Sequence, residues 1–220
     1  MIAPVARDTD GRGELRRALI DAAARLVATE GISALTLRRV ADEVGTSTMA
    51  IYTIFGGMPE LRRAIRHEGF ARLAEQLARV RTGADPVADL WMLGRAYYAN
   101  AIGDPHLYRV AFMEEPLDKG DAAVGSEAFQ LLVAGVERCI AAGRFGAADA
   151  TALATEFWAL GHGVITLQLA NLLSAEEAIR CLDGAVVKLF RGYGDDPHAT
   201  ERSLRRAVSR VGRLAAGRAR

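Results

Sequence analysis

The sequence has 220 residues, of which 50% are hydrophobic and 25% charged, and its formal net charge is +1. This balance is typical of a folded globular protein and excludes a disordered or fibrous chain. The length suits a small domain joined to a larger one.

Polar residues interrupt every apolar run, which excludes a bilayer-spanning segment. The longest run, residues 152–173, contains Glu156, His162 and Gln168, whereas a span needs about 20 apolar residues. Residues 1–10 also lack the apolar core of a secretory signal. We therefore expect a cytoplasmic protein with no membrane partner.

The two cysteines, Cys139 and Cys181, stand in apolar helical surroundings without CxxC or Cys/His clustering. This spacing predicts neither a zinc site nor a disulfide framework. We expect two buried free thiols, no metal and no cofactor.

Charge is unevenly distributed along the chain. Residues 1–81 carry a net +3, residues 82–190 a net −7 and residues 191–220 a net +5. This asymmetry fits a polyanion-binding end attached to a body that does not touch the polyanion.

Apolar residues recur at helical spacing along the whole chain, and no run alternates as a strand does, so we predict an all-α fold. A mobile loop is expected at 114–125, and residues 195–220 form either a basic amphipathic helix or a disordered tail. In chain order, the expected helices are 14–30, 37–44, 48–55, 59–80, 86–102, 105–113, 126–142, 148–173 and 175–190.

This pattern predicts five parts in the chain. They are a flexible arm (1–11), a helix-turn-helix DNA-binding domain (12–57), a connecting helix (58–82), a larger ligand-binding and dimerisation domain (83–192) and a basic C-terminal helix or tail (193–220).

Two short helices with a tight turn between them indicate the helix-turn-helix. Thr36 and Ser47 are suited to cap the two helices, and Gly45 ends the first. The second helix of such a motif fits the DNA major groove. Seven residues that face outward or cap these helices are candidates for DNA binding: Thr36, Arg38, Arg39, Ser47, Thr48, Met49 and Thr53.

The segments LTLRRVADEVGTS (35–47) and IYTIFGG (51–57) resemble the signature of TetR-type (TetR/AcrR) regulators. The resemblance implies that Thr36 and Tyr52 reach phosphates, and that Thr48, Met49 and Thr53 lie nearest the bases. No Arg, Asn or Gln lies between residues 46 and 55, so the usual bidentate base readers are absent. DNA shape, phosphate contacts and threonine hydroxyls are then expected to carry operator selectivity, with Met49 against a thymine methyl.

Three further segments resemble the C-terminal regulatory domain of the WHG group of TetR-type proteins: 97–100, 105–112 and 157–163. The large aromatic residues of this region suit a mostly apolar ligand pocket, although they also suit a packed core. His162 is a core histidine with a partner, a ligand anchor, or a catalytic or metal-binding residue. The candidate ligand-binding residues are Trp91, Tyr98, Tyr108, Phe112, Phe129, Trp158, His162 and Ile165.

The helices expected at 148–173 and 175–190 are apolar on more than one face, which predicts a homodimer. The resemblance implies a repressor that leaves a palindromic double-stranded operator when a small hydrophobic effector binds; activation remains the alternative. An enzyme is disfavoured because GxSxG, HExxH, P-loop and Rossmann signatures are all absent, so no catalytic residue is predicted. The helix-turn-helix signature disfavours a purely protein-binding module.

Overall fold

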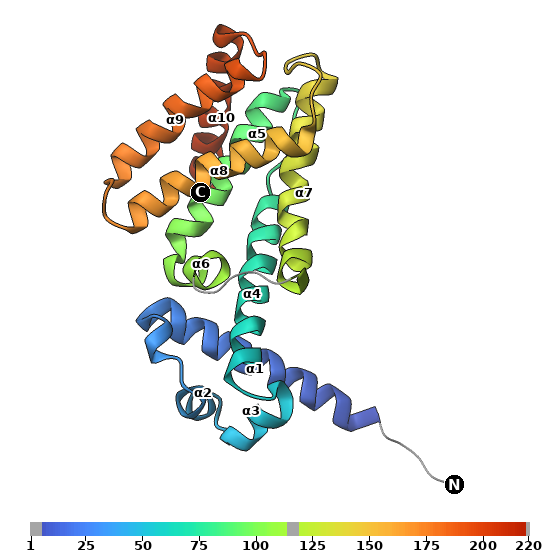
Figure 1. The fold of residues 1–220 in the computed structure, drawn as a ribbon, viewed down its shortest axis with the longest axis vertical. Helices are drawn as coiled ribbons and strands as arrows, with labels where there is room; N and C mark the ends of the chain where they lie inside the picture. The colour runs from blue at the N-terminus through green and yellow to red at the C-terminus, as the bar shows by residue number, and fades with distance from the viewer. Residues whose placement is uncertain (1–5, 114–118, 219–220) are drawn as a thin grey trace. The chain divides into compact units, whose positions relative to one another are not determined.

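The computed structural model describes residues 6–113 and 119–218 (Figure 1). Within these ranges the regular structure consists of ten α-helices and one short 3-10 helix, with no strand. The predicted all-α fold class is confirmed. No helix among the described residues is both long enough and apolar enough to cross a bilayer.

The chain divides into two compact units. Unit 1 comprises Met1–Arg72 and Asp104–Gly125, and unit 2 comprises Leu73–Gly103 and Ser126–Arg220. The second segment of unit 1 had been expected within the larger C-terminal domain. Its place in unit 1 follows from its packing, described next.

One apolar core holds unit 1 together. Leu107 and Val110 of α6 are buried in the same cluster as the apolar side chains of the N-terminal helices, and this packing draws the segment after residue 103 into unit 1. The helices that build this unit are α1 (Ala6–Glu30), η1 (Ile32–Ala34), α2 (Leu37–Val44), α3 (Thr48–Phe55), α6 (Pro105–Phe112) and the first parts of α4 (Met58–Ala78) and α7 (Lys119–Ala141).

Gly31 marks the point where α1 ends and α6 packs alongside. Its φ of +81° is a left-handed conformation that favours glycine. A Cβ atom at this position would lie 3.6 Å from the ring of His106. The residue therefore both stops the helix and leaves room for the neighbouring one.

A buried ion pair attaches the start of α7 to α4 within unit 1. The Arg66 guanidinium lies 2.5 Å from the Asp121 carboxylate, and the two side chains are 6% and 2% exposed. His67 Nε2 lies 2.9 Å from the other oxygen of the same carboxylate. Because removing one partner of a buried pair leaves an uncompensated charge, this contact strongly favours one position for the first turn of α7.

Unit 2 is a helical bundle in which α5 packs against α8 and α10, and α8 and α10 each pack against α9. Aromatic rings fill much of its core: Phe145, Phe190 and Tyr193 lie with ring centroids 5.2 to 6.0 Å apart. The complete helices of this unit are α5 (Pro86–Gly103), α8 (Ala150–Leu169), α9 (Ala175–Gly192) and α10 (Pro197–Arg218).

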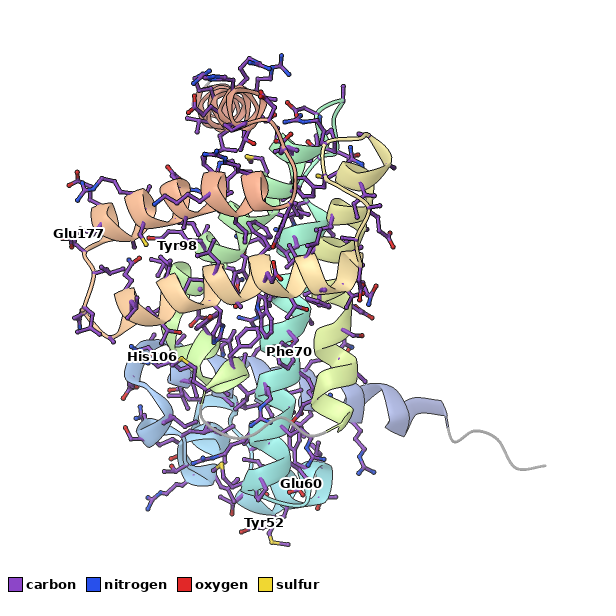
Figure 2. All side chains as sticks on the ribbon, turned by 45° about the horizontal axis from the view of Figure 1, so that its top comes forward. Tyr52, Glu60, Phe70, Tyr98, His106 and Glu177 are labelled. Carbon is purple, nitrogen blue, oxygen red and sulfur yellow. The ribbon has the colours of Figure 1, made fainter. Side chains whose placement is uncertain are left out.

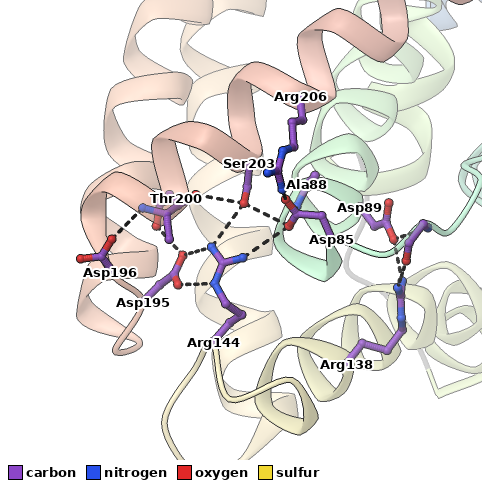
Figure 3. Close-up of polar contacts among 12 residues, drawn as sticks. Asp85, Ala88, Asp89, Arg138, Arg144, Asp195, Asp196, Thr200, Ser203 and Arg206 are labelled. Carbon is purple, nitrogen blue, oxygen red and sulfur yellow. Dashed lines mark hydrogen bonds and ion pairs between the residues drawn. The ribbon is translucent and has the colours of Figure 1, made fainter.

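Of the two alternatives expected for the C-terminal segment, a basic helix or a disordered tail, the structure has the helix, α10. A polar network anchors its first turns (Figure 3). Arg144 donates two hydrogen bonds to Asp195, at 2.6 and 2.8 Å, and Ser203 donates to Asp85 at 3.0 Å. The network joins α10 to the segment that precedes α5.

The starts of two helices and the burial of one cysteine differ from what the sequence predicts. Helix α1 begins at Ala6 rather than at residue 14, so residues 6–11 of the expected flexible arm are helical. Helix α7 begins at Lys119 rather than at residue 126, within the expected loop, of which residues 114–118 lie outside the described ranges. Cys139 is buried as expected, but Cys181 is exposed.

We predict that Gly94→Ala destabilises unit 2, because a Cβ there would lie 2.6 Å from Phe157 Cζ. Overpacking of this kind costs about 1–3 kcal/mol. Gly103→Ala, on the same helix and with nothing within 4 Å, is the control and should keep or slightly raise the stability. Urea unfolding at one protein concentration measures both, and equal midpoints for the two variants would contradict the packing described.

Candidate nucleic-acid interface and ligand site

The helix-turn-helix in unit 1 has the boundaries that its sequence predicts. The Thr36 hydroxyl accepts a hydrogen bond from Arg39 N, and the Ser47 hydroxyl accepts one from Ala50 N, so both residues cap their helices as expected. Gly45 ends α2 in the left-handed conformation, with φ of +73°. These local interactions fix the turn between the two helices.

Helix α3 has one buried and one exposed face. Ile51 and Phe55 are 0% and 7% exposed and belong to the core. Met49 and Tyr52 are 69% and 50% exposed, which is unusual for such large side chains, and Figure 2 shows Tyr52 projecting away from the helix. An eight-residue helix with an exposed thioether and phenol is suited to insertion into a groove of DNA.

The threonines on this surface differ in what they offer. Thr53 is exposed, and its hydroxyl donates to Met49 O at 2.9 Å, so this oxygen can still accept a hydrogen bond. Thr48 is half-buried. Thr36 accepts from Arg39 N, which leaves its hydroxyl hydrogen available to donate.

The two arginines of α2 are not equivalent. Arg39 makes a bidentate ion pair with Glu30, and both N–O distances are 2.7 Å. The Glu30 carboxylate raises the pKa of Arg39. Arg38 is exposed, and its contact with Asp42 is a 3.9 Å pair between exposed side chains, which stabilises little. Arg38 is therefore the more accessible cation for a phosphate.

Arg12 is a residue that sequence reasoning missed. It lies near the start of α1 and donates a hydrogen bond to Thr53 O at 3.0 Å. The contact joins residues 41 positions apart and brings a guanidinium next to the exposed face of α3. No local pattern indicated it, because its partner is 41 positions away and the first helix was expected to begin only at residue 14.

The candidate ligand-binding residues are divided between the two units. Tyr108 and Phe112 belong to unit 1, where Phe112 packs edge-on against Phe70 at 5.2 Å. The other six belong to unit 2. Of these, Trp91 and Ile165 are core residues, only 2% and 0% exposed.

Three candidates in unit 2 lie close together: two are hydrogen-bonded to the same tyrosine, and the third packs beside them. Trp158 Nε1 donates to the Tyr97 hydroxyl at 3.2 Å, and this hydroxyl lies 3.1 Å from His162 Nδ1. Phe129 packs edge-on against Trp158 at 6.2 Å. Tyr97, which was not among the candidate site residues, is therefore the centre of this aromatic cluster.

The aromatic cluster is closely packed. The cavity beside Tyr97, Phe157 and Trp158 has a volume of about 10 Å³, roughly the room that one water requires. Tyr98 lies apart from it and donates its hydroxyl hydrogen to Gln168 at 2.5 Å. Ligand binding by these residues stays a prediction.

A larger cavity of about 230 Å³ lies elsewhere in unit 2, between the end of α4, α5 and α7. Sequence reasoning did not find it, because its walls are aliphatic and no aromatic or histidine pattern marks them. Its lining residues are Leu77, Ala78, Val80, Thr82, Asp89, Leu93, Leu131, Ala134, Gly135 and Arg138.

Comparison with known proteins gives two family matches. Residues 19–65 match the model described as "Bacterial regulatory proteins, tetR family", and residues 90–189 match "Tetracyclin repressor-like, C-terminal domain". The second match covers the predicted regulatory region without testing its assignment to the WHG group.

Relatives and solved structures agree with these matches. An uncharacterized HTH-type transcriptional regulator of Mycobacterium tuberculosis is 25% identical over 177 residues, which is 80% of each chain. A Rhodococcus protein of unknown function superposes with a TM-score of 0.72 at 27% identity, over 81% of this chain and 95% of that one. RolR, solved in complex with resorcinol, superposes at 0.66 with 18% identity, over 89% and 95%.

Burial lowers the pKa of His162 from its ordinary value of 6.5. The unfolded chain therefore binds this proton at a higher pH than the folded protein does. We predict that stability falls as the pH is lowered from 7 through about 6.5, and that His162→Gln removes this part of the pH dependence. Urea unfolding across the pH range, with NMR of the His162 ring, checks both. A His162 pKa at or above 6.5 would contradict the burial described.

Proposed function

Because the chain belongs to the TetR family of DNA-binding transcriptional regulators, we propose that it acts in the cytoplasm as a homodimeric repressor. It holds a palindromic operator and releases it when a small hydrophobic effector binds. The observation that carries this proposal is the exposed face of α3, where two large side chains stand uncovered on a helix anchored by a buried core. Family membership identifies the chain as a transcription factor and not an enzyme.

We assign operator contacts to six residues and supporting roles to two more. Tyr52, Thr36 and Arg38 bind phosphates, since a hydroxyl or guanidinium on each is accessible. Met49, Thr48 and Thr53 contact base edges. Ser47 and Arg39 support them as a helix cap and through the ion pair with Glu30. With no bidentate reader on α3, selectivity rests on DNA shape and methyl contacts.

The proposed dimer surface is the outer side of α8 and α9. Small residues are exposed on both helices, among them Ala159 and Gly163 on α8 and Gly184 on α9, and Leu167 is 42% exposed. Small side chains allow helices of a second copy to approach closely, and a two-fold axis is the commonest way to build a homo-oligomer. Two recognition helices related by that axis read half-sites about 34 Å apart, or a multiple of this.

The aromatic cluster of unit 2 is the proposed effector site. Trp158 Nε1, the Tyr97 hydroxyl and His162 Nδ1 exchange hydrogen bonds that a phenolic ligand could replace. RolR, a protein of the same fold, is known with resorcinol. Since the cavity here is about 10 Å³, binding requires the rings of Tyr97, Phe157 and Trp158 that line it to move apart.

Effector binding then weakens the grip on DNA by changing the spacing of the two recognition helices. Coupling of about 1–3 kcal/mol is sufficient for a 5- to 150-fold change in affinity. Helix α4 is the element that transmits this change to α3, because it starts three residues after the end of α3 and continues into unit 2.

Fluorescence anisotropy tests the DNA-binding function. The protein is titrated onto labelled DNA from upstream of its own gene and onto scrambled DNA, at two salt concentrations. We expect tight, salt-sensitive preference for the upstream fragment, with a logarithmic salt slope of about 0.9 per phosphate neutralised. Failure to bind any genomic fragment would contradict the proposal.

The same assay tests the role of Tyr52. Tyr52→Phe removes one hydroxyl that is assigned to a phosphate, and a hydrogen bond to a charged group contributes about 1.5–3 kcal/mol. Operator binding should weaken about tenfold or more. Tyr98→Phe makes the same chemical change in unit 2, where the hydroxyl bonds to Gln168, and should leave binding unchanged. Equal effects of the two variants would remove Tyr52 from the interface.

The dimer surface is tested by Ala159→Arg, which places a long charged side chain on the exposed side of α8. We expect sedimentation equilibrium to show a monomer, and operator affinity to fall steeply, because one module then binds alone. Ala99→Arg, at an exposed position on α5, is the matched control and should remain dimeric. A dimer in both variants would place the interface elsewhere.

A further inference from the structure

We propose that the cavity between the end of α4, α5 and α7 is a second ligand site, and that it binds a small saturated carboxylate whose head group is held by Arg138. None of the residues that line this cavity belongs to the aromatic cluster. All of its lining residues belong to unit 2.

The walls of this cavity are aliphatic. Leu77 from α4, Leu93 from α5 and Leu131 from α7 contribute to them, and none of the lining residues is aromatic. Helices α5 and α7 approach each other closely at Gly135, because a Cβ atom at this position would lie 3.1 Å from Leu90 Cδ1. A volume of about 230 Å³ is larger than the roughly 150 Å³ of an apolar cavity known to bind benzene. The cavity therefore suits a compact hydrocarbon ring or a short chain.

The charged groups of the lining are Asp89 and Arg138, which are paired with each other (Figure 3). The Asp89 side chain is 3% exposed and already bonded: it accepts from Gly83 N at 2.6 Å and pairs with Arg138 Nη1 at 3.0 Å. The Arg138 side chain is 37% exposed. The charge that a ligand can reach is therefore positive.

The Arg138 guanidinium has N–H groups that its protein partners do not use. It uses Nη1 for Asp89 and Nη2 for Gly83 O at 2.8 Å, whereas a guanidinium carries five N–H groups. A planar carboxylate is the group that matches this geometry with two parallel hydrogen bonds. A neutral alcohol would make one weaker hydrogen bond, so the cavity should discriminate between an acid and its alcohol.

Occupation of the cavity would act on the segment between α4 and α5. Arg138 holds this segment through Gly83, and Arg144 and Ser203 hold it through Asp85. A carboxylate on Arg138 shares the guanidinium with Gly83 O and Asp89, and its body contacts Leu77 and Ala78 at the end of α4. A change in operator affinity follows only if the proposed function holds, whereas the binding itself does not depend on it.

The test measures binding directly on the full-length protein. Cyclohexanecarboxylate and its neutral match, cyclohexylmethanol, are titrated while methyl NMR follows Leu77, Leu93 and Leu131. We expect saturable shifts of these methyl groups with the acid, and at least about tenfold weaker binding of the alcohol. Equal affinity for both compounds, or no saturable shift with the acid, would overturn the proposal. This comparison needs no variant that risks misfolding.

Two variants locate the site. Arg138→Gln should weaken acid binding about tenfold or more, and Ala134→Leu, at an exposed position on α7, should block it by filling the cavity. Tyr97→Phe alters the aromatic cluster and should leave acid binding unchanged. Loss of binding in Tyr97→Phe alone would move the acid to the aromatic cluster and overturn the proposal. Operator anisotropy with and without the acid is a separate readout, so failure of DNA binding is distinguished from failure of this site.

Discussion

The apolar core of unit 1 is the contact on which DNA reading depends. Helix α3 has eight residues, too few to be stable alone in water, so its position is set by Ile51 and Phe55 in that core. With these two side chains buried, Met49 and Tyr52 are held outward. Leu107 and Val110 of α6 complete the same core. A segment far from the helix-turn-helix in sequence is thus part of the support of the recognition helix, and movement of α6 would disturb that support.

Local chemistry made the helix-turn-helix predictable. Thr36, Gly45 and Ser47 act through neighbours three or four residues away, so the boundaries of α2 and α3 follow from the sequence. The early start of α7 does not, because its first turn is held by Asp121 bonding to Arg66, 55 positions away. Arg12 was missed for the same reason, since its partner is Thr53. Contacts between distant residues leave no periodic pattern to read.

The same limit applies to the ligand-binding residues. Aromatic composition indicated a pocket, but it did not reveal which rings would be neighbours: Phe112 packs against Phe70 in unit 1, while Trp158 and His162 gather around Tyr97 in unit 2. The rings around Tyr97 pack closely and leave a cavity of only about 10 Å³. The larger cavity has aliphatic walls and a single accessible cation. The two proposed ligand sites of unit 2 are thus chemically distinct: the aromatic one has a cavity of only about 10 Å³, whereas the aliphatic one has a cavity of about 230 Å³.

In the proposed function, a symmetric pair of α3 helices reads DNA. Hydroxyl-radical footprinting of the protein on its operator tests this claim most directly, because it reports which stretches of backbone are covered. We expect two protected patches related by the operator dyad, centred about 34 Å apart or a multiple of this, and much weaker protection in the Tyr52→Phe variant at a protein concentration near the Kd of the unaltered protein. A single protected patch, or protection that Tyr52→Phe leaves unchanged, would contradict it.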